Sequence, residues 1–178
     1  ALYCVKPGKG GITYFSNNKQ SYVDLTDEKK QLVDKIISVV RFNPDREDTF
    51  YKLSPNDLEY SVFTGDFERE KGEPTEYGEF EKPLVNRHRR NGDRALYFCY
   101  PVIEDLKTTD GSKFEKKELW DFLLKYMFQE KYVYRHEWSE GDLIFNDQWN
   151  GLHRRTEVDS SEERFLYRVV FDLSLCQF

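Results

Sequence analysis

The chain has 178 residues, the length of one ordinary domain, and carries 27 Lys and Arg against 33 Asp and Glu, a net charge of −6. This acidic balance argues against a protein that binds the phosphate backbone of nucleic acid, because such proteins usually present a basic surface. Aromatic residues make up 16% of the sequence, which excludes a disordered chain and favours a folded, β-rich domain with a bulky interior.

The cysteines and the apolar runs restrict the cellular setting. Cys4, Cys99 and Cys176 are scattered and form no C-x-x-C pair, so they predict neither a disulfide framework nor a zinc site and indicate a reducing compartment. No apolar run of the sequence approaches the ~18 residues that a membrane span needs. We therefore expect a single cytoplasmic domain over residues 1–178, with no membrane or nucleic-acid partner.

The first quarter of the chain predicts two strands and a helix. Residues 1–5 and 12–15 are apolar and flank a turn cluster at residues 6–11. Thr26 is a good N-cap, and acidic residues follow it in the first turn. Apolar residues then recur at helical spacing, which predicts one helix over residues 27–40.

Residues 41–82 differ from the rest because prolines and glycines are spread through a stretch dense in charge. One long regular element is excluded, yet the stretch is too aromatic for a plain linker. We interpret it as an insertion packed over one mouth of the fold, which is typical of a lid. The alternative is a surface insertion without a role.

The remaining sequence alternates between hairpins and one further helix. Residues 83–87 and 95–100 flank Asn91-Gly92, a hairpin turn signal, and Ser112-x-x-Glu115 predicts the capping box of a helix that runs to Met127. Further strands are expected over residues 132–138, 142–145 and 164–171. With about seven strands and two helices, the pattern predicts a mainly β fold, a sandwich or jelly roll with flanking helices.

Three histidines are candidates for chemistry. We expect His88, in the hairpin turn, to be solvated, and His136, which alternates with tyrosines, to be packed and hydrogen-bonded. His153 is the strongest candidate, since it follows a strand and the polar corner at residues 146–151, where backbone turns aim side chains into a cavity.

Two arginines in the last strand form the other candidate pair. Period-two alternation places Arg164 and Arg168 on one face, about 13 Å apart, beside aliphatic neighbours. A buried guanidinium is tolerated only when it is paired, and it forks naturally onto carboxylates. The pair therefore indicates either two structural salt bridges or two anion clamps at the ends of a site.

An ordered set of motifs resembles the taurine dioxygenase-like (TauD/TfdA) enzymes, which are Fe(II)- and 2-oxoglutarate-dependent dioxygenases with a double-stranded β-helix, or jelly-roll, core. Their C-terminal signature is similar to residues 137–147, Leu152-His153-Arg154 and Arg164-x-x-x-Arg168. Earlier pieces follow in the expected order over nearly the whole chain: Gly10-Gly11-Ile12-Thr13 and the hairpin at residues 83–98.

The resemblance implies a role for each matching residue. His153 would be the distal ligand in a two-histidine, one-carboxylate iron site. Arg164, helped by the Thr13 hydroxyl, would bind the far carboxylate of the co-substrate 2-oxoglutarate. Arg168 would hold an anionic group of the substrate, and Asp147 would be a structural corner residue.

The implied reaction uses O₂ and 2-oxoglutarate to oxidise a C–H bond of a small molecule. Hydroxylation is the default outcome, with release of succinate and CO₂, and desaturation is an alternative. The resemblance, through Arg168, implies a small, anionic or amino-acid-like substrate; alternatively, aspartates and tyrosines of residues 50–80 would bind a cationic amino acid.

One motif of the family has no counterpart in the sequence. The first two iron ligands should form His-x-Asp or His-x-Glu, whereas His88, His136 and His153 are followed by Arg-Arg, Glu-Trp and Arg-Arg. We expect these ligands upstream of Ala1, which would make the domain N-terminally incomplete. Two alternatives remain: an inactive jelly-roll module that binds anions without iron, and a structural fragment whose arginines are ion-paired.

Overall fold

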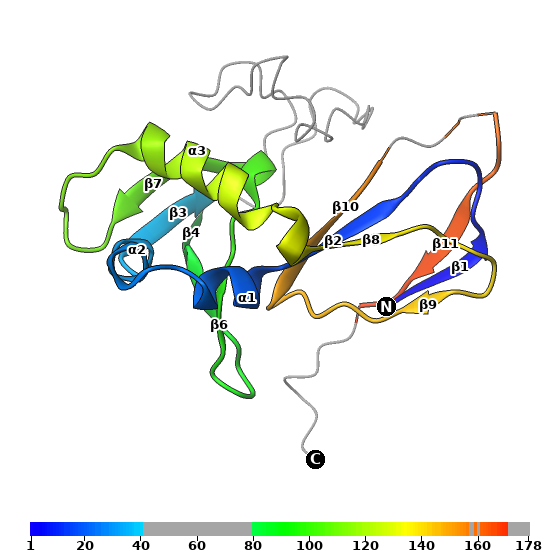
Figure 1. The fold of residues 1–178 in the computed structure, drawn as a ribbon, viewed down its shortest axis with the longest axis horizontal. Helices are drawn as coiled ribbons and strands as arrows, with labels where there is room; N and C mark the ends of the chain where they lie inside the picture. Colours follow the sequence, from blue (N-terminus) through cyan, green and yellow to red (C-terminus); the bar gives the residue numbers. More distant parts are fainter. Residues whose placement is uncertain (41–79, 157–158, 160, 171–178) are drawn as a thin grey trace.

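The computed structural model describes residues 1–40, 80–156, 159 and 161–170. Six strands form two three-stranded antiparallel sheets, seen on the right of Figure 1. One sheet has the order β11-β1-β9 and the other β10-β2-β8. Their bounds are β1 (Leu2–Lys6), β2 (Thr13–Asn17), β8 (Val133–His136), β9 (Leu143–Ile144), β10 (Gly151–Arg155) and β11 (Phe165–Arg168).

The connections between these six strands give the jelly-roll character. The chain passes from β1 to β2, from β8 to β9, from β9 to β10 and from β10 to β11, and each step crosses from one sheet to the other. Strands that are neighbours in sequence therefore lie in opposite layers. This arrangement brings residues near both ends of the described chain to one place.

A second group of elements, on the left of Figure 1, carries most of the hydrophobic core. It holds the sheet β4-β3-β7, the two-stranded pair β5-β6 and the helices that cover them. Fully buried core side chains come from the sheet, the segment after β6 and α3, namely Ile36, Leu106, Phe98, Leu123 and Met127. The bounds are β3 (Ile36–Val40), β4 (Phe80–Pro83), β5 (Val85–Arg87), β6 (Arg94–Leu96), β7 (Ile103–Thr108), α1 (Asn18–Val23), α2 (Asp27–Val33), α3 (Lys116–Met127) and two short 3₁₀ turns, Tyr100–Val102 and Glu130–Tyr132.

The predicted helix over residues 27–40 is wrong in its second half. Its start is confirmed, because the Thr26 hydroxyl accepts a hydrogen bond from the Lys29 amide at 3.3 Å. The helix ends at Val33, and Ile36–Val40 is the central strand β3. A run of β-branched residues fits a buried strand with a partner on each side, and pairing with β4 and β7 overrides the helical spacing.

The predicted capping box is also wrong, although the helix after it is confirmed. α3 begins at Lys116, and its N-cap residue Glu115 makes no side-chain capping bond. Ser112 belongs to the preceding turn, where its amide donates to Asp110 at 3.0 Å and its carbonyl accepts from the Thr108 hydroxyl at 2.8 Å. Side-chain bonds within this turn therefore compete successfully with a helix start.

The fold class is confirmed as mainly β with flanking helices, although several elements differ from expectation. The strands expected over residues 132–138, 142–145 and 164–171 are present in shorter form, while α1, β3, β7 and β10 were not predicted. Residues 80–82 of the predicted insertion belong to β4, and residues 41–79 lie outside the described residues. Cys4 and Cys99 are free thiols. Among the described helices, none is long and apolar enough to cross a membrane.

Candidate functional site

His153 lies in the middle of β10, and strand register decides what surrounds it. β2 pairs with β10 on one side and with β8 on the other, so His153, Phe15 and Tyr134 form one row across the sheet. The next row holds Arg155, Thr13 and His136. Directly opposed residues of antiparallel strands project from the same face, so the two rows form one surface.

The His153 imidazole is half-buried on this surface. Its ring lies 5.8 Å from the Phe15 ring, and its Nδ1 atom is 3.5 Å from the side-chain amide of Asn146. Burial, followed by the positive charges of Arg168 and of the N-terminus, lowers the pKa of His153 below its ordinary value. The environment thus favours neutral imidazole, the form that can offer a nitrogen lone pair to a metal ion.

The corner before β10 is held by Asp147, as predicted for a structural carboxylate. Asp147 accepts hydrogen bonds from the Trp149 amide at 2.9 Å and from the Asn150 side chain at 2.8 Å. β10 then starts at Gly151, where a Cβ atom would lie 2.5 Å from the Ser16 carbonyl oxygen. Only a glycine permits this close approach of β10 to β2, which sets the register that places His153.

Thr13 is 3% exposed and takes part in one specific contact. Its hydroxyl oxygen lies 2.8 Å from the indole Nε1 of Trp138. Because an indole N–H can only donate, the Thr13 oxygen accepts this bond and its own proton remains for another acceptor. Thr13 therefore offers a pre-positioned hydroxyl donor beside the row that contains His153.

Arg164 immediately precedes β11 and packs against the glycine turn between β1 and β2. Gly8 has a φ of +66°, and a Cβ atom there would lie 2.9 Å from the Arg164 Cβ. One guanidinium nitrogen donates weakly to the Gly11 carbonyl at 3.4 Å, while the Nε atom is buried without a partner. Burial, and then the positive charge of Arg155, lower the pKa of Arg164. An anion at this point would satisfy both the donor and the charge.

Arg168 lies on the same side of β11 as Arg164 and Leu166. The burial of neighbouring residues shows which side of this strand faces inward. Leu166 is half-buried opposite the fully buried Cys4, whereas Phe165 and Tyr167 on the other face are exposed. Within the described part of the chain, neither Arg164 nor Arg168 has a carboxylate partner. The described residues therefore lack the ion pairs that the structural-fragment alternative predicts, and the anion-clamp interpretation stays a prediction.

Of the predictions for the two other histidines, the one for His88 is wrong and the one for His136 is confirmed. His88 was expected to be solvated, which is wrong: its side chain is 14% exposed, and its Nε2 lies 3.3 Å from an Asp147 carboxylate oxygen. The β5-β6 turn packs onto the corner before β10, with the His88 ring edge-on to Trp149. His136 is packed and hydrogen-bonded, as predicted.

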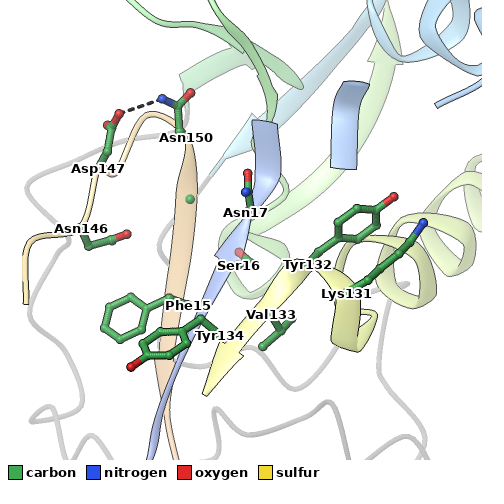
Figure 2. A pocket seen from close by; sticks show the side chains of 11 residues that line it. Phe15, Ser16, Asn17, Lys131, Tyr132, Val133, Tyr134, Asn146, Asp147 and Asn150 are labelled. Carbon is green, nitrogen blue, oxygen red and sulfur yellow. Dashed lines mark hydrogen bonds between the residues drawn. The ribbon is translucent and has the colours of Figure 1, made fainter. Parts of the chain in front are cut away.

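A groove of about 460 Å³ runs over the start of β10 and the end of β2 (Figure 2). Phe15 and Tyr134 lie side by side at one end, and Asn146, Asp147 and Asn150 line another side. Sequence analysis did not identify Phe15, Tyr134 or Asn146 as lining residues. Alternation placed Tyr134 beside His136, but only strand register shows that Phe15 separates Tyr134 from His153.

The family resemblance implies that the site binds 2-oxoglutarate and Fe(II). The described residues suit the first of these ligands better than the second. Arg164 and Thr13 suit a carboxylate, since they offer a charge and hydrogen-bond donors without internal partners. An iron site of this kind needs three protein ligands, and His153 is one imidazole. Within residues 1–40, 80–156, 159 and 161–170, no group of three or more His, Cys, Asp or Glu could hold a metal. These residues therefore do not form an iron site by themselves.

Comparison with known proteins identifies relatives. The chain is 26% identical over 161 residues to pentalenolactone F synthase of Streptomyces arenae, covering 90% of this chain and 52% of the relative. It is 27% identical over 167 residues to the alpha-ketoglutarate-dependent 2,4-dichlorophenoxyacetate dioxygenase of Burkholderia sp. (strain RASC), covering 93% and 50%. The chain spans about half the length of the curated relatives it matches.

Solved structures confirm the predicted jelly-roll fold. A taurine dioxygenase from Burkholderia xenovorans matches with a TM-score of 0.67 at 21% identity, over 93% of this chain and 48% of that one. AAD-2 in complex with Mn(II) and N-oxalylglycine matches with a TM-score of 0.64 at 22% identity, over 93% and 59%. The family profile described as "Taurine catabolism dioxygenase TauD, TfdA family" matches residues 1–170. The chain belongs to the TauD/TfdA family of dioxygenases.

Proposed function

We propose that this chain carries the 2-oxoglutarate site and one iron ligand of an Fe(II)- and 2-oxoglutarate-dependent dioxygenase. The observation that carries the proposal is Arg164, a guanidinium with a buried, unpartnered Nε and no internal carboxylate partner among the described residues. A protein with 33 acidic residues could readily have paired this cation. Its unpaired state supports binding of a carboxylate ligand from solution.

The proposed binding of 2-oxoglutarate uses Arg164 and Thr13 together. Arg164 forks onto the carboxylate distant from the 2-oxo group, and Thr13 donates its hydroxyl proton to the same carboxylate. Trp138 holds the Thr13 oxygen in place, which limits the entropy lost on binding. These contacts fix the direction of the co-substrate, so its 2-oxo acid end points away from Arg164.

His153 is the proposed iron ligand on β10. Its half-buried, neutral imidazole suits this role, and the Asn146 side chain beside Nδ1 would orient the ring. The proposal requires two further ligands, which the described residues do not supply. Bound Fe(II) with 2-oxoglutarate and O₂ would supply the oxidising chemistry, with succinate and CO₂ as co-products.

The substrate is proposed to be a small anionic molecule that is hydroxylated at a C–H bond. Arg168 supports this class, because this exposed arginine shares one side of β11 with Arg164 and its charge lies close enough to His153 to lower the pKa of that imidazole. A carboxylate or sulfonate on Arg168 would hold a C–H bond of the substrate near His153. Names of two relatives fit this class, since they specify 2,4-dichlorophenoxyacetate and a sulfate ester.

A second candidate function is an anion-binding jelly-roll module without catalysis. Its supporting observation is that His153 is a single candidate ligand among the described residues. In such a module Arg164 and Thr13 would still bind 2-oxoglutarate, but metal would not strengthen the binding.

Anaerobic addition of Fe(II) and 2-oxoglutarate to the full chain separates the two functions. The dioxygenase predicts a visible charge-transfer band, and succinate formation once O₂ is admitted. His153→Ala should remove both signals, whereas His88→Ala should keep them, because His88 contacts only the Asp147 corner. Absence of the band, with 2-oxoglutarate binding that does not depend on metal, would instead support the anion-binding module.

A further inference from the structure

A hydrogen-bonded chain of three side chains leads from the turn after β8 into the groove. The Tyr134 hydroxyl lies 3.2 Å from His136 Nδ1, and His136 Nε2 lies 3.0 Å from an Asp142 carboxylate oxygen. The same Asp142 oxygen accepts the Ser139 amide proton at 2.7 Å. The backbone of the turn therefore holds the Asp142 carboxylate in place, and this carboxylate orients the His136 imidazole.

The middle of this chain, His136, and its groove end, Tyr134, differ in exposure. The His136 side chain is 14% exposed and packs edge-on against Trp138, with 4.5 Å between the ring centroids. Tyr134 is 61% exposed, lines the groove and stacks on Phe15 at 6.4 Å. Phe15 separates Tyr134 from His153 in the same row of the sheet. A partly buried polar pair, His136 and Asp142, thus sets the hydrogen bonding of an accessible phenol near the candidate iron ligand.

The protonation state of His136 decides the direction of the bond to Tyr134. In the neutral ring, Nε2–H donates to Asp142, so Nδ1 is an acceptor and the Tyr134 proton points to it. The phenol oxygen then offers only lone pairs to the groove. When the ring is protonated, Nδ1–H donates to the phenol oxygen, and the Tyr134 proton is released toward the groove.

We propose that Tyr134 is a substrate-binding hydroxyl and that His136, held by Asp142, is the positioning residue that sets its polarity. With neutral His136, the groove selects a substrate group that donates, such as a hydroxyl or an ammonium. With protonated His136, it selects an acceptor, such as a carboxylate or an ether oxygen. This inference rests on the proposed function, in that the groove is taken to hold the substrate.

Several charged groups lie around His136. Asp142 is its direct partner, and Glu140 lies in the same turn. Arg155 stands in the same row beyond Thr13, and Arg164 lies within electrostatic range of Arg155. Arg135 and Glu137, the sequence neighbours of His136, form an exposed ion pair with each other.

The test measures binding of 2,4-dichlorophenoxyacetate, a probe whose polar groups are all acceptors above its own carboxyl pKa, to the full chain between pH 5.5 and 8.5. Binding should weaken about tenfold as the pH rises, since one hydrogen bond to a charged group is lost. The midpoint should coincide with the titration of the His136 ring followed by NMR. His136→Gln should make the binding independent of pH, because a glutamine side chain does not titrate.

Tyr134→Phe is the decisive variant. It should bind the probe about tenfold more weakly at pH 5.5 and show no pH dependence, while the control Tyr3→Phe, on the outer face of β1, should behave as wild type. Persistent pH dependence in Tyr134→Phe would show that the His136 charge attracts the probe directly, and would overturn the proposal. Probe binding that does not vary with pH, or no probe binding at any pH, would overturn it as well.

Binding of N-oxalylglycine, a 2-oxoglutarate analogue, separates this inference from the proposed function. If the chain binds N-oxalylglycine but its binding of 2,4-dichlorophenoxyacetate does not vary with pH, the role of Tyr134 is refuted and the 2-oxoglutarate site is not. Loss of N-oxalylglycine binding, with the expected pH dependence of the probe intact, would refute the 2-oxoglutarate site and leave the role of Tyr134 standing.

Discussion

Replacement of Arg164 by leucine should abolish strong binding of 2-oxoglutarate without destabilising the fold. In the structure the guanidinium has a buried Nε without a partner, and its only protein hydrogen bond among the described residues is a 3.4 Å contact to Gly11. The substitution therefore removes almost nothing that holds the protein together. It also removes a cation that burial and the charge of Arg155 disfavour.

The size of the binding effect follows from the contacts that a carboxylate would lose. Truncating one partner of a buried, hydrogen-bonded charge pair costs roughly 2–5 kcal/mol. Arg164 is half-buried, so we expect the lower part of this range, roughly 2–3 kcal/mol, which weakens binding about 30- to 150-fold. The melting temperature should stay equal or rise, since an unpaired buried charge is costly.

Isothermal titration of N-oxalylglycine into the wild-type chain and into Arg164→Leu measures this difference, with thermal unfolding recorded on the same samples. The matched control is Arg135→Leu, which removes an exposed arginine paired with Glu137. The control should leave the dissociation constant unchanged. Equal affinity in Arg164→Leu would refute the assignment, and a large drop in melting temperature would show that Arg164 has an internal role instead.

Three further predictions concern the framework of the site. Thr13→Val should weaken N-oxalylglycine binding about fivefold and leave the buried indole N–H unpaired, at a cost of about 1–3 kcal/mol in unfolding free energy; calorimetry checks both, and unchanged affinity would contradict the donor role. Gly151→Ala should cost about 1–3 kcal/mol in denaturant unfolding, because its Cβ meets the Ser16 carbonyl oxygen at 2.5 Å; an unchanged midpoint would refute the close approach. The hydrogen bond from Tyr132 lowers the pKa of Asp24, so its stabilisation exists above the ordinary carboxyl pKa near 3.8 and is lost as the pH falls through the lowered value. Asp24→Asn should therefore flatten the acid limb of the stability profile below pH 4, and an unchanged slope would count against this coupling.

The sequence is most informative where side-chain alternation and chemistry agree. In β11, period two correctly places Arg164, Leu166 and Arg168 on one side, and the burial of Cys4 opposite Leu166 identifies that side as the interior. The packed state of His136 follows from its place between aromatic residues in β8. Local pattern suffices in both cases because the strand itself determines which residues share a face.

Prediction fails where tertiary pairing decides. Ile36–Val40 has helical spacing, yet it becomes a strand because two partner strands from later in the chain bury both of its edges. The same holds for the groove, in which Phe15 lies more than a hundred residues before Tyr134 and Asn146 in the sequence. No local pattern contains a register, so the row of His153, Phe15 and Tyr134 is visible only in the folded sheet.

The charge of the candidate site depends on the hydrogen-bond partners of two carboxylates, Asp142 and Asp147. The chain carries a net charge of −6, yet positive charges act on the candidate site residues, Arg168 on His153 and Arg155 on Arg164. Asp142 is engaged by His136 and a backbone amide, and Asp147 by two donors of its own corner and by His88. Among the described residues, neither carboxylate forms an ion pair with Arg164 or Arg168. Each carboxylate accepts a backbone amide of its own turn, at Ser139 for Asp142 and at Trp149 for Asp147, and this local pairing is compatible with the proposed anion site in an acidic protein.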